Sequence, residues 1–251
     1  MHIAVLGGGS WGTALADMLA RKGERVRLWV RNAEAAREIS ETGMNARYLP
    51  GHALCPALEA RSDPAEVLHG TDCVVLAIPC QSMDGCLRDL RGFFPPAPRI
   101  VCASKGVELG TFRTMRQVVE DGLAGLTPRY AILSGPSFAS EVAACRPTAV
   151  VLGCTDPDMA DFAQHLFSTR HLRVYVNDDV TGVELGGAVK NIMAIASGIA
   201  DGVGFGENAR AGLITRGLSE MSRLGAALGA RPETFMGLSG LGNGSDRKSV
   251  V

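Results

Sequence analysis

One lysine, Lys190, lies in a run of small and apolar residues that reads GGAVKNIMA over positions 186–194. A charge inside a packed helix is costly unless it is paired or used in chemistry. On a helix, the face that carries Lys190 also carries small residues, namely Gly186, Gly187, Ala194 and Ser197. We therefore expect its ammonium group to point across a shallow groove, where it could exchange a proton with a ligand. The spacing is equally consistent with a lysine at the edge of a core helix, with no role in chemistry.

A glycine-rich turn near the start of the chain carries the pattern G-x-G-x-x-G at Gly7, Gly9 and Gly12. It follows the apolar run His2–Leu6 and precedes a helical stretch, which is the context that the pattern needs. The first glycine permits a tight turn, the second lets the backbone approach a pyrophosphate, and the third lets helix and strand pack closely. The helix N-terminus then favours the anion. The pattern predicts dinucleotide binding, against the alternative of a structural glycine turn.

The second apolar run is followed directly by Arg31, at the place where sites that prefer NAD usually carry an acidic residue for the ribose hydroxyls. An arginine can instead pair with the 2′-phosphate of NADP and stack on the adenine. The alternative is a solvent-facing arginine after a strand. The sequence thus permits NADP or NAD as the cofactor and does not decide between them.

Polar residues follow two further apolar runs. Lys105 comes directly after one of them, and Gly135 and Ser137 come after the next. In an open α/β sheet, ligands bind beyond the carboxyl ends of the strands, so these residues are candidates for contacts to a phosphate or a carboxylate. Taken alone, Lys105 is as well explained as a surface lysine. The turn that contains Ser137 is as well explained as a structural helix cap.

The elements that must position these residues are short apolar runs with helical stretches between them. The runs are His2–Leu6, Val26–Val30, Cys73–Ile78, Ile100–Ala103, Tyr130–Leu133, Thr148–Leu152 and Leu172–Val176. Most are continuously apolar, which is typical of a parallel sheet covered by helices on both faces. Asp63 and Asp156 each precede a proline and are expected to cap the helices that follow.

After about Asp178 the pattern becomes helical. A stripe of apolar residues at steps of four and three predicts one helix, with Leu185, Val189, Ile192, Ala196 and Ile199 facing inward. Asn208 is expected to cap a second helix that Gly229 closes, with Ile214, Leu218, Met221 and Leu228 facing inward. The predicted fold is α/β, with a doubly wound Rossmann-type domain over residues 1–178 and a partial all-α domain over residues 179–251.

The composition argues against several functions. A net charge of −1 gives no reason to expect a nucleic-acid partner. The seven cysteines lack metal-type or disulfide-type spacing, so we expect free thiols, no metal site and a cytoplasmic location. No signal segment is expected, and no apolar run reads as long enough to span a membrane.

Several segments resemble one family, the bacterial NAD(P)-dependent glycerol-3-phosphate dehydrogenases. They are GGGSWGTALA, ASKG, SGPSFASEV, FMGLSGLG and the block from Gly182 to Ala230 that contains VKNIMA. The resemblance extends from Met1 to Gly242, and the block around Lys190 is far more specific than the glycine loop.

The resemblance implies reduction of dihydroxyacetone phosphate to sn-glycerol 3-phosphate for phospholipid synthesis, with a homodimer as a possible assembly. Lys190 matches the residue that exchanges the proton on the substrate oxygen. The positions that match substrate contacts are Lys105, Gly135, Ser137, Lys190, Asn191 and Asn243. The positions that match cofactor contacts are Gly7, Gly9, Ser10, Trp11, Gly12, Arg31, Lys105 and Ala139. An alkoxide that develops as hydride arrives needs a cation and a proton nearby, and a lysine supplies both.

The sequence departs from the family after Gly242. Asn243 stands where the family has an aspartate that supports the catalytic lysine, and an amide carries no negative charge. The family's arginine cluster is absent from residues 243–251, and nothing indicates that Arg247 replaces it. We expect a truncated or frame-shifted chain with weak turnover, or else a genuine short paralogue.

Two other functions remain open at this point. One is a two-domain dehydrogenase of the 3-hydroxyacyl or 6-phosphogluconate type, which is also built from a Rossmann domain and a helical domain. The other is a catalytically inactive dinucleotide-binding module, which Asn243 favours.

Overall fold

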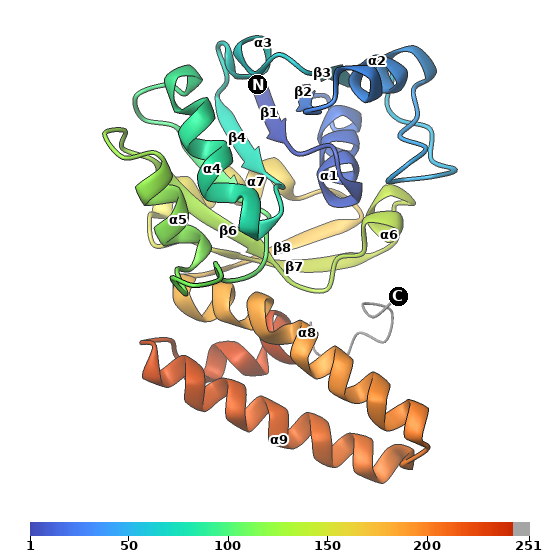
Figure 1. The fold of residues 1–251 in the computed structure, drawn as a ribbon, viewed down its shortest axis with the longest axis vertical. Coiled ribbons are helices and arrows are strands. Elements are labelled where there is room, and N and C mark those ends of the chain that lie inside the picture. The colour runs from blue at the N-terminus through green and yellow to red at the C-terminus, as the bar shows by residue number, and fades with distance from the viewer. Residues whose placement is uncertain (243–251) are drawn as a thin grey trace.

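The computed structural model of the chain is described here for residues 1–242, and Figure 1 shows a sheet region above a pair of long helices. The strands are β1 (His2–Leu6), β2 (Arg25–Trp29), β3 (Glu59–Arg61), β4 (Cys73–Leu76), β5 (Arg99–Cys102), β6 (Arg129–Ser134), β7 (Thr148–Gly153) and β8 (Leu172–Asn177). They form one sheet in the order β3-β2-β1-β4-β5-β6-β7-β8. The first six follow the order 3-2-1-4-5-6 of dinucleotide-binding sheets. The predicted Rossmann-type sheet is therefore confirmed.

Helices cover both faces of this sheet. They are α1 (Ser10–Arg21), α2 (Ala33–Thr42), α3 (Pro64–Leu68), α4 (Cys80–Leu90), α5 (Met115–Gly122), α6 (Ala139–Ala143) and α7 (Pro157–Phe167). A short 3₁₀ helix, η1 (Arg91–Phe93), follows α4. The helices α1, α2, α6 and α7 pack into one apolar core, whereas α3, α4, α5 and the start of α8 pack into the core on the other face. Because both faces are covered, the central strands carry apolar residues on both sides.

The seven predicted apolar runs all become strands, with ends shifted by at most two residues. The prediction missed β3, which spans only Glu59–Arg61 at the sheet edge and has two charged residues. It also missed that β6 and β7 run antiparallel, with Ser134 opposite Val151. A strand buried on both faces is apolar whichever way it runs, so its composition does not encode its direction. The predicted caps are confirmed, since the Asp63 and Asp156 carboxylates accept hydrogen bonds from Ala65 N and Met159 N.

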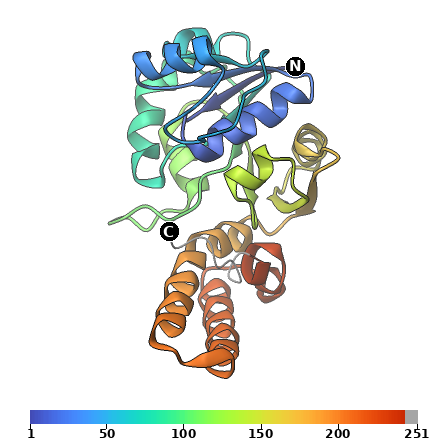
Figure 2. The same cartoon turned by 90° about the vertical axis from the view of Figure 1, so that its right-hand side faces the viewer.

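The helical region consists of α8 (Val180–Val203), α9 (Gly206–Ala227) and two short turns, η2 (Pro232–Met236) and η3 (Leu238–Gly242). Figure 2 shows this region as a separate layer below the sheet. Asp179 caps α8 by accepting from Gly182 N at 2.9 Å, and it also accepts from Thr234 Oγ1 at 2.6 Å. The prediction that Asn208 caps α9 is wrong, because the helix starts at Gly206, its N-cap is Phe205, and Asn208 lies inside its first turn. Gly229 has a φ of +86° just beyond α9, as expected for a helix-ending glycine.

The predicted inward face of α8 is only partly right. Leu185 is buried, but Ile192 and Ile199 are 66% and 61% exposed. The buried side of the outer half of α8 instead carries Met193, Ala194, Ser197 and Ala200. Small residues let neighbouring backbone approach closely: a Cβ at Gly186 would lie 2.6 Å from the Ser239 carbonyl oxygen. The small face that we expected to leave a groove beside Lys190 is therefore packed at this point. On α9, Met221 is buried, but Leu228, also predicted to face inward, is 55% exposed.

Helix α8 is long and apolar enough to cross a membrane by length and composition, with a mean hydropathy of 1.2 over its most apolar window. By that criterion the expectation that no apolar run is long enough to span a membrane was wrong. Half of the window is buried inside the protein, and the helix packs against β6, β7 and α9. A core helix has the same properties, so this feature is weak evidence for a membrane span.

Candidate active site

A cleft of about 1740 Å³ opens at the carboxyl ends of β1, β2, β4 and β5. This edge of a doubly wound sheet is where ligands bind in such folds. The predicted site residues that line the cleft are Gly7, Gly9, Ser10, Trp11, Gly12, Arg31, Lys105 and Ser137. These residues come from four separate chain segments and meet in one cavity, although they are up to 130 positions apart in the sequence.

The three glycines of the predicted loop have different structural roles. Gly7 has a φ of +125°, and a Cβ on it would overlap the carbonyl oxygen of Ala77. A Cβ on Gly12 would overlap the carbonyl oxygen of Gly7, so this glycine lets α1 pack onto the turn. A Cβ on Gly9 would meet nothing within 4 Å. Gly9 therefore leaves space in the cleft that the protein itself does not fill.

The indole of Trp11 adds a second sign that a ligand belongs in the cleft. Its Nε1 is buried and has no hydrogen-bond partner in the described part of the chain. Buried polar groups are nearly always paired, so an orphaned donor in a cleft calls for a bound partner. With the open space at Gly9 and the N-terminus of α1 beside it, the residues present fit a dinucleotide with a pyrophosphate.

Arg31 is exposed at the mouth of the cleft, directly after β2 and Val30. It lies near Cys86, where its charge opposes the effect of burial, which raises the pKa of that thiol to about 11. Burial also raises the pKa of Cys80, another thiol that lines the cleft. Both cysteines stay protonated at neutral pH, so neither is prepared to act as a nucleophile. As predicted, all seven cysteines are free thiols.

Lys105 connects the cleft to the turn after β6. Its Nζ donates to the carbonyl oxygen of Gly135 at 2.8 Å, and Ser137 Oγ donates to the same oxygen at 3.2 Å. Gly135 is buried with a φ of +125°, and a Cβ there would lie 3.0 Å from Val150 Cα. Three of the predicted substrate contacts therefore meet at one carbonyl group, although Gly135 itself is not part of the cleft lining.

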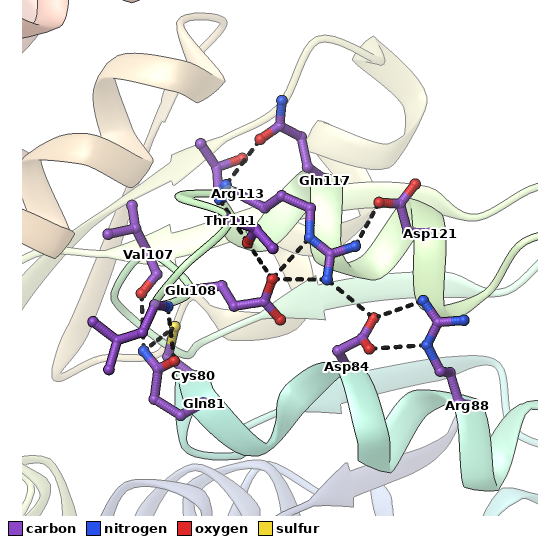
Figure 3. Close-up of polar contacts among 12 residues, drawn as sticks. Cys80, Gln81, Asp84, Arg88, Val107, Glu108, Thr111, Arg113, Gln117 and Asp121 are labelled. Atoms are coloured by element: carbon purple, nitrogen blue, oxygen red, sulfur yellow. Dashed lines mark hydrogen bonds and ion pairs between the residues drawn. The ribbon is translucent and has the colours of Figure 1, made fainter.

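The loop that follows Lys105 is held in place from α4, and Figure 3 shows the contact of Gln81 with Val107. The Gln81 side chain donates to the Val107 carbonyl at 2.9 Å and accepts from Leu109 N at 2.9 Å. Arg113 closes the loop, forming ion pairs with Glu108 at 2.7 Å and with Asp121 at 2.6 Å. A rigid loop loses less entropy when its lysine binds a ligand.

Helix α8 approaches the Lys105 loop at Gly187, where a Cβ would lie 2.7 Å from Ser134 Oγ and 3.5 Å from Lys105 Cγ. Lys190 is half-buried and lies one helical turn further along the same side of α8. Lys190 and its exposed neighbour Asn191 are not part of the cleft lining.

Two predicted residues remain apart from this arrangement. Ala139 begins the short helix α6, half-buried against the core beside α1, and does not line the cleft. Asn243 lies outside the described residues.

The sequence patterns singled out neither the parts of α2 and α4 that line the cleft nor the loop between α2 and β3. Met44, Asn45, Arg47 and Tyr48 from this loop line the cavity. The loop has no periodic pattern and follows no strand, so neither of the signals used above could have singled it out.

The comparisons with known proteins agree with this geometry. A family model described as NAD-dependent glycerol-3-phosphate dehydrogenase N-terminus matches residues 2–160, and the corresponding C-terminus model matches residues 179–244. The glycerol-3-phosphate dehydrogenases [NAD(P)+] of Maridesulfovibrio salexigens and Nitratidesulfovibrio vulgaris are 54% and 58% identical to this chain. Each match covers 97% of this chain and 74% of the relative.

A solved structure supports the same assignment. The crystal structure of glycerol-3-phosphate dehydrogenase from Coxiella burnetii has a TM-score of 0.91 and 43% identity, over 97% of this chain and 74% of that one. The family models, the relatives and this structure agree, and so the chain belongs to the NAD-dependent glycerol-3-phosphate dehydrogenase family.

Proposed function

We propose that this chain reduces dihydroxyacetone phosphate to sn-glycerol 3-phosphate with NADH or NADPH, in the cytoplasm and for phospholipid synthesis. One observation carries the proposal: the open glycine loop and Lys105 line the same cleft, so a dinucleotide and a phosphorylated ketone can meet there. Family membership makes this substrate the first to test. A homodimer and the absence of a membrane span belong to the same proposal.

The first part of the proposed site binds the cofactor. Gly7 and Gly12 shape the turn, Gly9 leaves room for the pyrophosphate, and Ser10 and Trp11 offer donors beside it. Arg31 at the cleft mouth suits the adenosine end, with or without a 2′-phosphate. The bound nicotinamide supplies the hydride. Ala139, at the start of α6, is the remaining proposed contact to the cofactor.

The second part binds the substrate and handles the proton. Lys105 supplies positive charge where an alkoxide develops. The Gly135 carbonyl accepts from Lys105 Nζ, and Ser137 Oγ donates to the same carbonyl. Lys190 donates the proton to that oxygen, with Asn191 and Asn243 as further substrate contacts. We propose residues 1–178 as the dinucleotide-binding domain and residues from 179 onward as the helical domain that presents Lys190.

The experiment is a comparison of Lys190→Met with the unsubstituted chain. We expect the rate of NADH or NADPH oxidation with dihydroxyacetone phosphate to fall by about 1,000-fold, a loss typical of a missing proton donor. The dissociation constant of the cofactor, measured by its fluorescence, should stay within about two-fold, because the cleft lining does not include Lys190.

Lys22→Met is the matched control, because Lys22 donates to the Leu166 carbonyl at the end of α7 and does not line the cleft. Its turnover should equal that of the unsubstituted chain. Two outcomes would contradict the proposal: full activity in Lys190→Met, or cofactor binding without any turnover in the unsubstituted chain. The second outcome would instead favour a dinucleotide-binding module.

A further inference from the structure

Asn45 lies in the loop between α2 and β3, and its side chain reaches the glycine loop. It is 4% exposed, and its Nδ2 donates to the Gly8 carbonyl at 3.0 Å and to Thr13 Oγ1 at 2.8 Å. Its Oδ1 accepts from Tyr48 N at 3.2 Å. Both amide protons and the amide oxygen are thus used, so the position needs a donor and an acceptor on one side chain.

These contacts fix the peptide groups on both sides of Gly9. Asn45 holds the Gly8 carbonyl, and Thr13 N donates to the Gly9 carbonyl at 2.9 Å. In a trans peptide the C=O and N–H groups point in opposite directions. The bond from Asn45 to the Gly8 carbonyl therefore aims the Gly9 N–H away from the Asn45 amide.

The Gly9 N–H is available to a ligand. It has no acceptor in the described part of the chain, and the space around the Gly9 Cα is open to the cleft. It lies directly before the first turn of α1, whose free N–H groups favour an anion. A backbone donor that is already aimed costs little entropy when it binds, whereas a glycine peptide that can rotate costs more.

We propose that Asn45 is a positioning residue for the cofactor: it orients the Gly8–Gly9 peptide toward the pyrophosphate of the bound dinucleotide. It acts through the glycine loop and makes the loop between α2 and β3 part of the cofactor site. This inference rests on the proposed function only in taking a dinucleotide as the ligand, and it does not require turnover.

The experiment measures binding to the purified chain and its variants. Asn45→Ala removes the amide, and Asn45→Asp keeps its shape but places a carboxylate against the Gly8 carbonyl. Leu49→Ala is the matched control, because Leu49 is 4% exposed in the same loop but packs into the apolar core. The probes are NADH and NADPH by fluorescence, with ADP and adenosine as competitors, since ADP has a pyrophosphate and adenosine has none.

We expect Asn45→Ala to weaken the binding of NADH, NADPH and ADP by about 10-fold, because a well-placed set of hydrogen bonds is lost. The binding of adenosine should weaken by less than about two-fold. Asn45→Asp should weaken the binding of NADH, NADPH and ADP further, and this variant serves as the test if Asn45→Ala does not fold. Leu49→Ala should lower the melting temperature and leave all four affinities nearly unchanged.

Three outcomes would overturn the inference. Equal losses for ADP and adenosine in the Asn45 variants would mean a general structural effect. Wild-type affinity for NADH in both variants would mean that the Gly8 contact does not matter. Failure of the unsubstituted chain to bind either dinucleotide would refute the inference and the proposed function together, whereas the first two outcomes leave the proposed function intact.

Discussion

The sheet region and the helical region of this chain are built in different ways. The sheet is enclosed by two large apolar cores, and its central strands are buried almost completely. The helical region has a small core of Leu185, Met193, Met221, Ala230 and Phe235. Large apolar side chains such as Ile192, Ile195 and Ile199 remain exposed on α8.

The difference shows how each region holds its part of the site. In the sheet region, backbone geometry positions the site residues: the glycine turn, the strand ends and the hydrogen bond from Gln81 to the Val107 carbonyl leave them little freedom. In the helical region, Lys190 depends on where α8 lies, and a few contacts decide that. They are the Asp179 cap, the packing at Gly186 and Gly187, and the buried Glu184. Substitutions in the two regions should therefore have different effects on stability and on the site.

The largest expected effect is in the sheet region, at the glycine loop. A Cβ on Gly12 would overlap the Gly7 carbonyl oxygen, which is backbone and cannot swing aside. We expect Gly12→Ala to cost about 3 kcal/mol or more in the free energy of unfolding and to abolish measurable cofactor binding. Denaturant unfolding and cofactor fluorescence measure the two losses.

Gly9→Ala separates stability from binding at the same loop. No protein atom lies within 4 Å of the added methyl group, so the free energy of unfolding should change by less than about 1 kcal/mol. Cofactor affinity should still fall, because the methyl group enters the space left for the pyrophosphate. Normal affinity in this variant would show that the open space is not used by the cofactor.

A somewhat smaller loss of stability than that of Gly12→Ala is expected in the helical region, at Phe235. This ring is 1% exposed and packs where a Cβ on Gly225 of α9 would overlap it. We expect Phe235→Ala to cost about 3 kcal/mol, with the loss confined to α8 and α9. Hydrogen exchange should show faster exchange in α9 and unchanged protection in β1 and β4.

The control for this substitution is Ile199→Ala on the exposed face of α8. The side chain is 61% exposed, so its loss should change the free energy of unfolding by no more than about 0.5 kcal/mol. If Ile199→Ala cost as much as Phe235→Ala, this face of α8 would be covered in solution, and the contrast between the two regions would have to be redrawn.

The sheet could be predicted because local patterns carried the information. Continuous apolar runs, capping aspartates and the glycine turn each specify a structure over a few residues, and β1 matches its prediction residue for residue. Strand β3 could not be predicted, since three residues with two charges make no pattern. The inward face of α8 was misjudged because close backbone packing at glycine outweighed the burial of isoleucine.

The site could be predicted where residues follow a strand or form a motif. Gly9, Arg31, Lys105 and Ser137 were found this way and line one cleft. Asn45 was missed because its contacts to Gly8 and Thr13 bridge more than 30 positions, and such pairings leave no trace in a single sequence. The proposed role of Lys190 came from the resemblance to the dehydrogenase family and not from the spacing of residues around it.

The last prediction concerns Glu184, which lies where the two regions join. Its Oε1 accepts from Tyr130 OH and from Arg116 N, both at 2.7 Å, so it ties α8 to β6 and α5. Burial raises the pKa of this carboxyl above its ordinary value, although the Tyr130 hydrogen bond opposes the rise. Between the unfolded pKa and the raised folded pKa, the folded state holds the proton more tightly. Its contribution to stability is therefore complete below the unfolded value and is lost as pH rises through the folded one.

Glu184→Gln should remove this dependence, because the amide stays neutral while its oxygen still accepts both hydrogen bonds. At pH 4 the variant and the unsubstituted chain should unfold at similar denaturant concentrations. At pH 8 the variant should be more stable by about 1 kcal/mol, since it no longer buries a charge. The exposed Glu120, which pairs with Arg116 at 2.8 Å, is the control, and Glu120→Gln should give no such gain. A Glu184→Gln variant that lost stability at pH 8 would show that the junction needs the charge, so that α8 is held there by electrostatics and not by packing alone.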